Sequence, residues 1–415
     1  MKTSPKKPEL LAPAGNLEKL EVAIEFGADA VYLAGKAFSL RNFSGNFTDQ
    51  ELTQAVDFAH HAGVKVYLAC NIYSRNPEQA AIVGFLERIG HLNPDAVIIA
   101  DPGIIDLAAT IIPEIPIHLS TQANTTNYNA VNFWGKVGVK RVNLARELTL
   151  TEIREIKQRS DLEIETFIHG AMCISYSGRC LLSSFLSGRD SNQGACTHPC
   201  RWNYSVVEEQ RPGHYHSLME DERGSYLFNS KDLCMLDHIP ELMDAGIDSL
   251  KIEGRMKGVN YLASVVKAYR MAIDSYSADP AHYSLDPEWT QELSQLYHRG
   301  YCTGFYFNDP NQTLPNYDNL RKGMIHGFIG RIVDSPGKRQ ITVDVRNKIS
   351  PGDTIEILTP QGINPSTLIT QILDKNMSPI DHGQPNTRST LVIQIDAPST
   401  GIIRKADPSD NRTDL

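Results

Sequence analysis

Short apolar runs recur along the first 253 residues, and four of them follow a glycine that closes a helix-like stretch, as in FGADAVYLAG and AGIDSLKIEG. A glycine in this place supplies the left-handed residue that ends a helix. The runs are short, rich in β-branched residues and rarely alternate, which is typical of parallel strands buried on both faces. The pattern predicts eight strands, near residues 9–13, 29–34, 64–71, 96–100, 116–122, 140–145, 163–168 and 248–253.

The stretches between these strands carry helix start signals. Thr48 with Glu51, and Thr149 with Glu152, fit the capping box, in which a hydroxyl accepts from the third backbone NH and the glutamate reaches back. Asn16 is a further candidate N-cap. Strands that alternate with helices predict the α/β class. Eight of them favour a (β/α)8 barrel, complete or distorted, over the alternative of an open doubly wound sheet.

The pattern changes from about residue 325, where short alternating runs and turn signals such as Ser350-Pro351-Gly352-Asp353 replace the buried strands. This change predicts a small C-terminal β-barrel domain over 325–408. Residues 276–324 read as a helical linker, and residues 1–275 as the α/β barrel. A cysteine-rich loop at 169–201 is inserted between the seventh and eighth predicted strands.

Composition limits the class of protein. The chain has 415 residues, of which 41% are hydrophobic and 21% charged, so that it can bury the core of two domains. A net charge of −9 argues against coating nucleic acid through bulk charge. A local basic surface stays open, although we favour solvated loop charge for its candidate residues, which are Arg321, Lys322, Arg331, Lys338, Arg339, Arg346 and Lys348.

The N-terminus has lysines but lacks the apolar segment of a signal peptide. No stretch approaches the roughly 18 uncharged apolar residues of a membrane span. We therefore expect a cytoplasmic protein without a membrane partner.

Polar residues follow the predicted strands at one and the same end. Alone, each reads as a loop cap or a hydrogen-bond partner, but their repetition at the carboxyl ends is typical of the catalytic face of a barrel. The residues are Asn71, Asp101, Ser120, Gln122, Asn124, Arg146, Glu147, His169, Glu253 and Arg255.

Four of the seven cysteines lie within the loop, at Cys173, Cys180, Cys196 and Cys200. Cytoplasmic thiols stay reduced, so metal binding or catalysis is favoured over disulfides. Spacing alone leaves zinc and iron–sulfur binding nearly level, with buried structural cysteines as the remaining alternative.

The other three cysteines, Cys70, Cys234 and Cys302, lie in apolar or helical contexts and are predicted core residues. Cys234 stays open as a substitute for Cys200. A cysteine peptidase would need a base beside its thiol, for which His169 and His198 are candidates, but neither stretch matches a local peptidase signature. The chain contains neither GxGxxG at a strand–helix junction nor GxxxxGK[ST].

The segment ETFIHGAMCISYSGRCLLS resembles the signature of the collagenase-like peptidase family of unassigned catalytic type. The likeness continues through ELLAPAGNLEKLEVAIEFGADAVYLAG, IHLSTQANTTN, RDSNQGACTHPCRW, NSKDLC, LKIEGRMK and HRGYCTGF, and so covers nearly the whole chain. The resemblance implies an oxygen-independent hydroxylase that carries a [4Fe–4S] cluster and acts on RNA bases or ubiquinone precursors. The cluster ligands that it implies are Cys173, Cys180, Cys196 and Cys200.

Within the family, VNLARELTLTEI, EEQRPGHYHSLMEDERGSY and LTPQG resemble the branch that makes 5-hydroxyuridine at the wobble position of the tRNA anticodon loop, with prephenate as the oxygen source. Alternatives are hydroxylation of ribosomal RNA or a quinone, a peptidase, and an RNA-binding module with a structural cluster. The sequence leaves open a paralogous partner subunit.

Prephenate carries two carboxylates, and the planar fork of arginine binds a carboxylate in a bidentate manner. The candidates are Arg41, Arg146, Arg201 and Arg255, with Arg146 and Arg255 favoured. His169 and Glu253 are the candidate catalytic residues, and with Gln122 and Asn124 they would orient a uracil or shuttle protons. A base in an anticodon would have to unstack to reach them.

Overall fold

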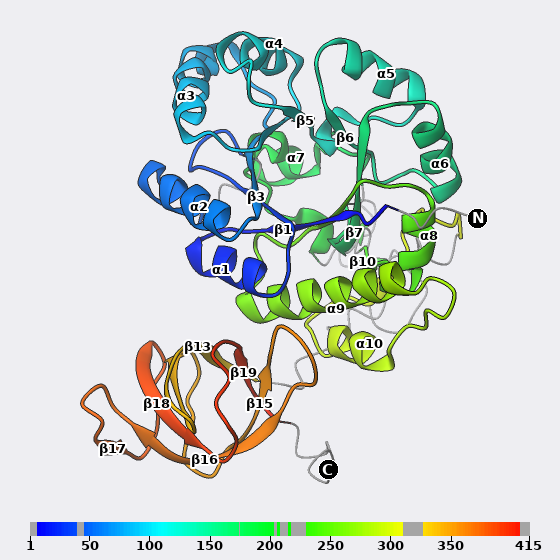
Figure 1. The fold of residues 1–415 in the computed structure, drawn as a ribbon. Coiled ribbons are helices and arrows are strands. Elements are labelled where there is room, and N and C mark those ends of the chain that lie inside the picture. The colour runs from blue at the N-terminus through cyan, green and yellow to red at the C-terminus, as the bar shows by residue number, and fades with distance from the viewer. Residues whose placement is uncertain are drawn as a thin grey trace.

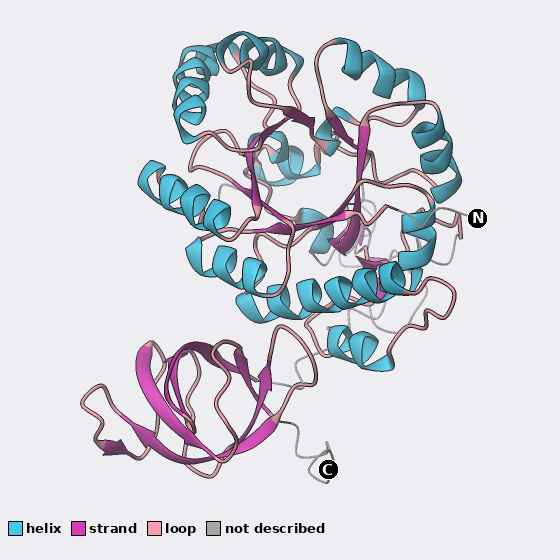
Figure 2. Ribbon diagram, in the orientation of Figure 1, coloured by secondary structure: helices cyan, strands magenta, loops and turns pink. Residues whose placement is uncertain are grey.

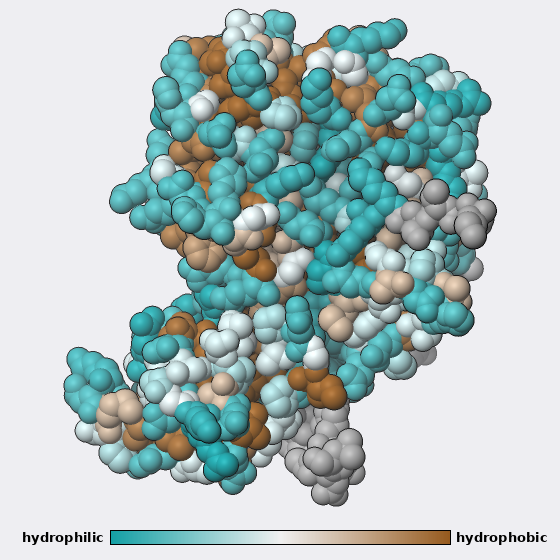
Figure 3. Space-filling model, in the orientation of Figure 1, coloured by the Kyte–Doolittle hydropathy of each residue, from teal (hydrophilic) through white to brown (hydrophobic). Residues whose placement is uncertain are grey.

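The structure, a computed structural model, describes residues 6–39, 45–173, 175–202, 206–207, 215–216, 230–309 and 327–406. Figures 1 and 2 show two parts: a ring of strands enclosed by helices, and a smaller barrel made of strands. In the face shown in Figure 3, hydrophilic side chains cover most of the larger part.

Eight parallel strands form the ring. Each strand pairs with its neighbour in chain order, and β11 pairs with both β7 and β1, which closes the barrel. The structure thus confirms the (β/α)8 barrel and excludes the open sheet. The strands are β1 (Glu9–Pro13), β2 (Ala30–Leu33), β3 (Lys65–Cys70), β4 (Ala96–Ile99), β5 (Ile117–Leu119), β6 (Arg141–Asn143), β7 (Glu163–Ala171) and β11 (Ser249–Ile252).

Helices cover the outside of the ring and begin where the sequence predicts. Asn16 accepts from the backbone NH of Lys19, and both predicted capping boxes are present, at Thr48 and at Thr149. Apolar faces of these helices pack on the strands in one large core. The helices are α1 (Leu17–Glu25), α2 (Asp49–His61), α3 (Gln79–Leu92), α4 (Pro102–Ile111), α5 (Tyr128–Lys136), α6 (Leu150–Gln158), α8 (Ile239–Asp244) and α9 (Val259–Ala278).

Ion pairs cross the interior of the barrel, where Val, Ile and Leu usually dominate. Lys251 Nζ lies 2.8 Å from Glu165 Oε1, and Arg141 lies 3.5 Å from Glu165 and 2.6 Å from Glu9. Tyr67 donates to Glu9 over 2.6 Å. Lys251, Glu165 and Arg141 are buried, so the pairs offset the large cost of desolvating each charge.

The segment between β7 and β11 begins at the carboxyl end of β7 and therefore at the mouth of the barrel. Its strand β10 pairs antiparallel with β7, and β12 (Tyr301–Cys302) pairs parallel with β10. The segment contains α7 (Leu182–Ser187), η3 (Ser191–Gln193), η4 (Pro199–Arg201), β8 (Val206–Val207), β9 (Tyr215–His216), β10 (Asp232–Cys234) and η5 (Leu236–His238).

The C-terminal part is a closed antiparallel barrel of six strands, as the alternating pattern predicts. The strands follow the order β15-β19-β13-β14-β18-β16, and β16 returns to β15. Isoleucine, valine and leucine fill its core. The strands are β13 (Phe328–Gly337), β14 (Gln340–Val345), β15 (Thr354–Leu358), β16 (Ser366–Leu373), β18 (Thr387–Ile393) and β19 (Ile402–Lys405), and β17 (Pro379–Ile380) pairs with β16.

Ion pairs fix the small barrel against the large one. Arg331 contacts Glu25 of α1 over 2.6 Å, and Arg346 contacts Glu18 over 3.1 Å. Arg404 is 1% exposed and pairs with Glu292 of α10 (Pro287–Ser294) over 2.6 Å. Arg331 and Arg346 are therefore interdomain ion-pair residues, which corrects their interpretation as loop charges.

The predicted limits of the linker at 276–324 stay a prediction, because residues 310–326 lie outside the described part of the chain. Within that described part, none of the helices combines the length and the hydrophobicity that crossing a membrane requires.

Candidate active site

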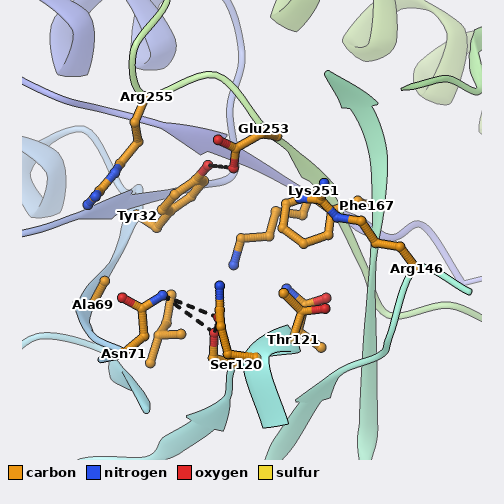
Figure 4. Close-up of a pocket in the computed structure, with 13 residues that line it drawn as sticks. Tyr32, Ala69, Asn71, Ser120, Thr121, Arg146, Phe167, Lys251, Glu253 and Arg255 are labelled. Atoms are coloured by element: carbon orange, nitrogen blue, oxygen red, sulfur yellow. Dashed lines mark hydrogen bonds between the residues drawn. The ribbon is translucent and has the colours of Figure 1, made fainter. Parts of the chain in front are cut away.

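A cavity of about 50 Å³, here the barrel pocket, lies at the carboxyl ends of the barrel strands (Figure 4). Strand ends and the turns after them supply its polar side chains, as the sequence predicts for a barrel. Its charged residues are Arg146, Lys251, Glu253 and Arg255, and its uncharged polar residues include Asn71, Ser120, Thr121, Gln122 and Asn143.

Two cations of the barrel pocket are almost completely buried. The Lys251 side chain extends from β11 toward the middle of the pocket, and its Nζ lies 4.6 Å from the centre of the Tyr32 ring (Figure 4). Arg255 donates from Nη2 to Ser39 Oγ over 2.7 Å. Lys251 and Arg255 are 4% and 3% exposed, so a ligand that reaches them must shed its water.

Arg146 lies where the barrel pocket meets the cysteine-rich loop. Its Nη1 donates to the carbonyl oxygen of Ala171 over 2.6 Å, and its guanidinium lies 3.8 Å from the centre of the Phe167 ring. The hydrogen bond and the cation–π contact hold the charge in one place.

Side-chain amides face the cations across the barrel pocket. Asn71 Nδ2 lies 3.5 Å from Ser120 Oγ and 3.5 Å from Gln122 Oε1, and Ser120 also donates to Gln122. Asn143 is 2% exposed, and its Oδ1 has no hydrogen-bond partner among the described residues. A buried acceptor without a partner is costly, so Asn143 is ready to accept from a ligand.

Glu253 is the carboxylate among the described residues that line the barrel pocket. Its Oε2 lies 3.4 Å from the Tyr32 hydroxyl, which also lies 3.0 Å from the carbonyl oxygen of Ile252. The side chain is therefore held beside the cations and can accept a proton from a bound molecule.

A second cavity, of about 130 Å³, adjoins the first and is here called the cysteine cavity. Thr121, Gln122 and Arg146 line both cavities, so that they are neighbours across one wall. The cysteine cavity is lined by the four loop thiols, Cys173, Cys180, Cys196 and Cys200.

Two of the thiols, Cys173 and Cys180, are hydrogen-bonded to each other, and Cys196 contacts His198. A hydrogen bond from Cys173 lowers the pKa of Cys180 to about 5, and the same bond raises the pKa of Cys173. Cys196 Sγ accepts from the backbone NH of His198 over 3.4 Å and lies 3.9 Å from His198 Nδ1.

The kind of these side chains suits a metal or cluster. Four thiols around one cavity are the donor set of zinc and iron–sulfur sites. In the conformation seen, no three His, Cys, Asp or Glu side chains of the described residues lie close enough together to hold a metal ion. Binding would therefore require the thiols to close around the group.

The remaining cysteines lie elsewhere. Cys70 and Cys302 are buried, as predicted. Cys234 lies on β10 with its Sγ 3.8 Å from the Tyr269 hydroxyl, and burial raises its pKa to about 11. Cys200 lines the cysteine cavity and Cys234 does not, which favours Cys200 as the fourth donor.

The loop that carries the thiols is seated directly on the barrel. Gly178 has a φ of +72° and lies so close to Gln122 that a Cβ there would be 2.2 Å from the carbonyl oxygen of Gln122. The backbone NH of Ser177 donates to Glu147 Oε1 over 2.9 Å, so Glu147 anchors the loop. These contacts place the thiols over η2 (Thr121–Ala123).

His169 and Asn124 do not join the site residues described above. His169 is 1% exposed and packs among Tyr261, Tyr269 and Tyr301, with its Nδ1 3.3 Å from the Tyr269 hydroxyl. Burial lowers its pKa to about 3, so the ring is neutral. Asn124 ends η2 with a φ of +53° and is not among the described residues that line either cavity.

The two other predicted arginines are not placed. Arg41 lies outside the described residues. Arg201 ends η4 beside Cys200, but its side chain lies outside the described part. Sequence reasoning missed Lys251 and Asn143, although a lysine within the apolar run LKI and an asparagine within VNLA are signals that could have indicated them.

The chain is similar to known proteins over most of its length. Residues 15–316 match the model of peptidase family U32, and residues 325–404 match the model of the C-terminal domain of that family. The chain is 41% identical over 377 residues to tRNA hydroxylation protein P1 of Bacillus subtilis, covering 91% of the chain and 89% of the relative.

Two further relatives are from Escherichia coli. The chain is 39% identical over 397 residues to tRNA hydroxylation protein P, covering 86% of the chain and 87% of the relative. It is 32% identical over 364 residues to 23S rRNA 5-hydroxycytidine C2501 synthase, covering 86% of the chain and 53% of that longer relative.

Proposed function

The chain belongs to peptidase family U32, and from that premise we propose that it is an enzyme that hydroxylates tRNA. More narrowly, we propose that it converts the wobble uridine of the anticodon to 5-hydroxyuridine, with prephenate as the oxygen donor and a [4Fe–4S] cluster on the four loop cysteines. The observation that carries the proposal is the shared wall between the cysteine cavity and the cationic barrel pocket.

The barrel pocket suits a small molecule with carboxylates. Three cations, Arg146, Lys251 and Arg255, line it together with one carboxylate, Glu253. Guanidinium and ammonium groups in a dry pocket bind carboxylates through charge-assisted hydrogen bonds. Glu165 already neutralises Lys251 in part, so the arginines carry most of the charge available to a ligand.

The cysteine cavity would hold the cluster, with Cys173, Cys180, Cys196 and Cys200 as ligands. Such a cluster supplies one-electron redox or Lewis-acid chemistry when bound. Thr121 and Gln122, which face both cavities, would orient the uracil at the boundary. Glu253 would be placed to exchange a proton with the bound molecule, because it lines the same pocket as the cations and contacts Tyr32.

His169 does not take part in the proposed reaction, because its ring packs against Tyr261, Tyr269 and Tyr301 and does not line the barrel pocket. Ribosomal RNA is the second candidate substrate, and the similarity to the 23S rRNA 5-hydroxycytidine synthase supports it. The two proposals differ only in the RNA and in the base that is hydroxylated.

Mass spectrometry of nucleosides separates them. A strain that lacks this chain should lose 5-hydroxyuridine from its tRNA and keep the hydroxylated nucleosides of its 23S rRNA. Anaerobically purified protein should form 5-hydroxyuridine in tRNA from that strain when prephenate is added. A matched control is Cys302→Ala, which alters a buried cysteine away from the cavity and should keep activity. Unchanged tRNA in the deletion strain would refute the proposal.

A further inference from the structure

The cysteine-rich loop, residues 169–201, and Trp202 directly after it expose large apolar side chains. Tyr176 is 64% exposed, Leu181 56%, Leu186 49% and Trp202 44%. Single exposed apolar residues are common on proteins, but several on one loop beside a cavity are typical of a binding surface.

Tyr176 differs from the other three, because it also lines the cysteine cavity. Its carbonyl oxygen accepts from the backbone NH of Arg179 over 3.0 Å, and the next residue, Ser177, is bonded to Glu147. The backbone under the ring is thus fixed. Among the described residues, no aromatic pair includes Tyr176, and nearly two thirds of the residue is accessible to solvent.

The loop is basic in an acidic protein. Residues 169–201 contain three arginines and one aspartate and neither lysine nor glutamate, so the loop carries +3 − 1 = +2 in a chain of −9. The aspartate, Asp190, lies 3.3 Å from Arg75, whose side chain is 73% exposed. Arg179 and Arg189 are exposed. This charge is complementary to the phosphates of a nucleic acid.

We propose that Tyr176 is a stacking surface for a base of the RNA substrate that has left its own stack and enters the cysteine cavity. The inference rests on the proposed function, since it takes the RNA as the partner. Proteins that read single-stranded RNA loops stack splayed bases on aromatic rings and bind the flanking phosphates with arginines. A base stacked on Tyr176 is held at the cavity that the thiols line, and the exposed arginines of the loop contact the backbone on either side.

Equilibrium binding tests this role without relying on turnover. The probe is a fluorescein-labelled anticodon stem-loop with uridine at the wobble position, and its partner is the same RNA with an abasic wobble nucleotide. Tyr176→Ala should weaken binding of the intact RNA by about 5- to 150-fold, the range of one base–aromatic stack. Tyr176→Phe should bind like the wild type, because the ring suffices for stacking.

The abasic RNA separates stacking from other contacts. Wild type and Tyr176→Ala should bind it equally, since the base that Tyr176 would stack is missing. Phe133→Ala on α5 is the matched control, because Phe133 is 55% exposed and lies on an outer helix of the barrel. Thermal denaturation checks that each variant is folded. We expect Tyr176→Ala to fold, because Tyr176 is exposed.

If the wild type hydroxylates tRNA, either of two results would overturn the role of Tyr176 and leave the proposed function standing. The first is normal binding of the intact RNA by Tyr176→Ala. The second is an equal loss of affinity for the intact and the abasic RNA in that variant. A wild type that binds neither RNA and modifies no tRNA would refute the proposed function as well.

Discussion

The close contact between the cysteine-rich loop and the barrel can be tested by adding one side-chain carbon at Gly178. Gly178→Ala would place a Cβ 2.2 Å from the carbonyl oxygen of Gln122. A carbon and a carbonyl oxygen in close contact are about 3.3–3.6 Å apart. The loop and η2 must therefore separate by about 1 Å, because both groups belong to backbone that cannot rotate away.

The consequence reaches both cavities, because Gln122 lines each of them. A displacement of about 1 Å between reacting groups can lower a rate about 100-fold. We therefore expect kcat/KM for tRNA hydroxylation to fall about 100-fold in Gly178→Ala. Alanine in the left-handed region adds a cost of about 1–2 kcal/mol in stability.

Gly188→Ala isolates that second effect. Gly188 lies in the same loop with a φ of +65°, close to the +72° of Gly178, but a Cβ there would meet nothing within 4 Å. This variant should lose about 1–2 kcal/mol by chemical denaturation and keep its kcat/KM within about threefold. Equal kcat/KM values for the two variants would refute the reasoning, because both glycines have a positive φ and only a Cβ at Gly178 would clash with Gln122.

Three further predictions concern other parts of the molecule. Cys200→Ala should lose iron after anaerobic reconstitution and Cys234→Ala should keep it, and the reverse result would reassign the fourth donor. Lys251→Met should raise the KM for prephenate at least about tenfold, as expected for the loss of one charged contact of roughly 1.4 kcal/mol or more. The iron content should stay unchanged. An unchanged KM would show that Lys251 does not contact the ligand. Arg404→Met should cost about 3–5 kcal/mol in urea denaturation at pH 7, because it leaves Glu292 buried without its partner. Burial raises the pKa of Glu292, but Arg404, together with Ser264 and Lys267, outweighs burial and lowers it, so the contribution of this pair is present above about pH 4.3 and is lost as the pH falls through the folded pKa. The stability difference between the variant and the wild type should therefore shrink in acid, and a constant difference would contradict the assignment.

The strands and caps of the barrel could be predicted because their signals are local. A glycine that ends a helix and the short apolar run after it lie within ten residues of each other, and each of the eight predicted strands overlaps an observed one. The capping box at Thr48 likewise needs only Thr48 and Glu51. The C-terminal barrel followed from alternation within single strands.

The exact membership of the site depends on tertiary geometry that the sequence does not display. The prediction of the seventh strand ended at residue 168, whereas β7 continues to Ala171. An irregularity in its pairing with β11 lies between Phe167 and His169, and such a bulge shifts the alternation of side chains. Phe167 consequently faces the barrel pocket, and His169 faces the tyrosines on the other side.

Lys251 was missed for a related reason. The sequence pattern indicates functional residues at the ends of strands, whereas Lys251 lies within β11 and lines the barrel pocket. Its burial is tolerated only because Glu165, which lies 86 residues earlier in the chain, is directly opposite. A pair of that sequence separation cannot be recognised until the barrel is closed.

The ion pairs inside the barrel have a kinetic consequence. Glu165, Arg141 and Glu9 fill the interior beneath Lys251, so the described part of the barrel is packed there, and the barrel pocket lies on the same side as the cysteine cavity, with which it shares Thr121, Gln122 and Arg146. In the function proposed above, the small co-substrate would therefore lie beneath the nucleotide and would bind before it. We predict ordered binding, with the co-substrate first and the RNA second, which initial-rate kinetics with both substrates varied would test.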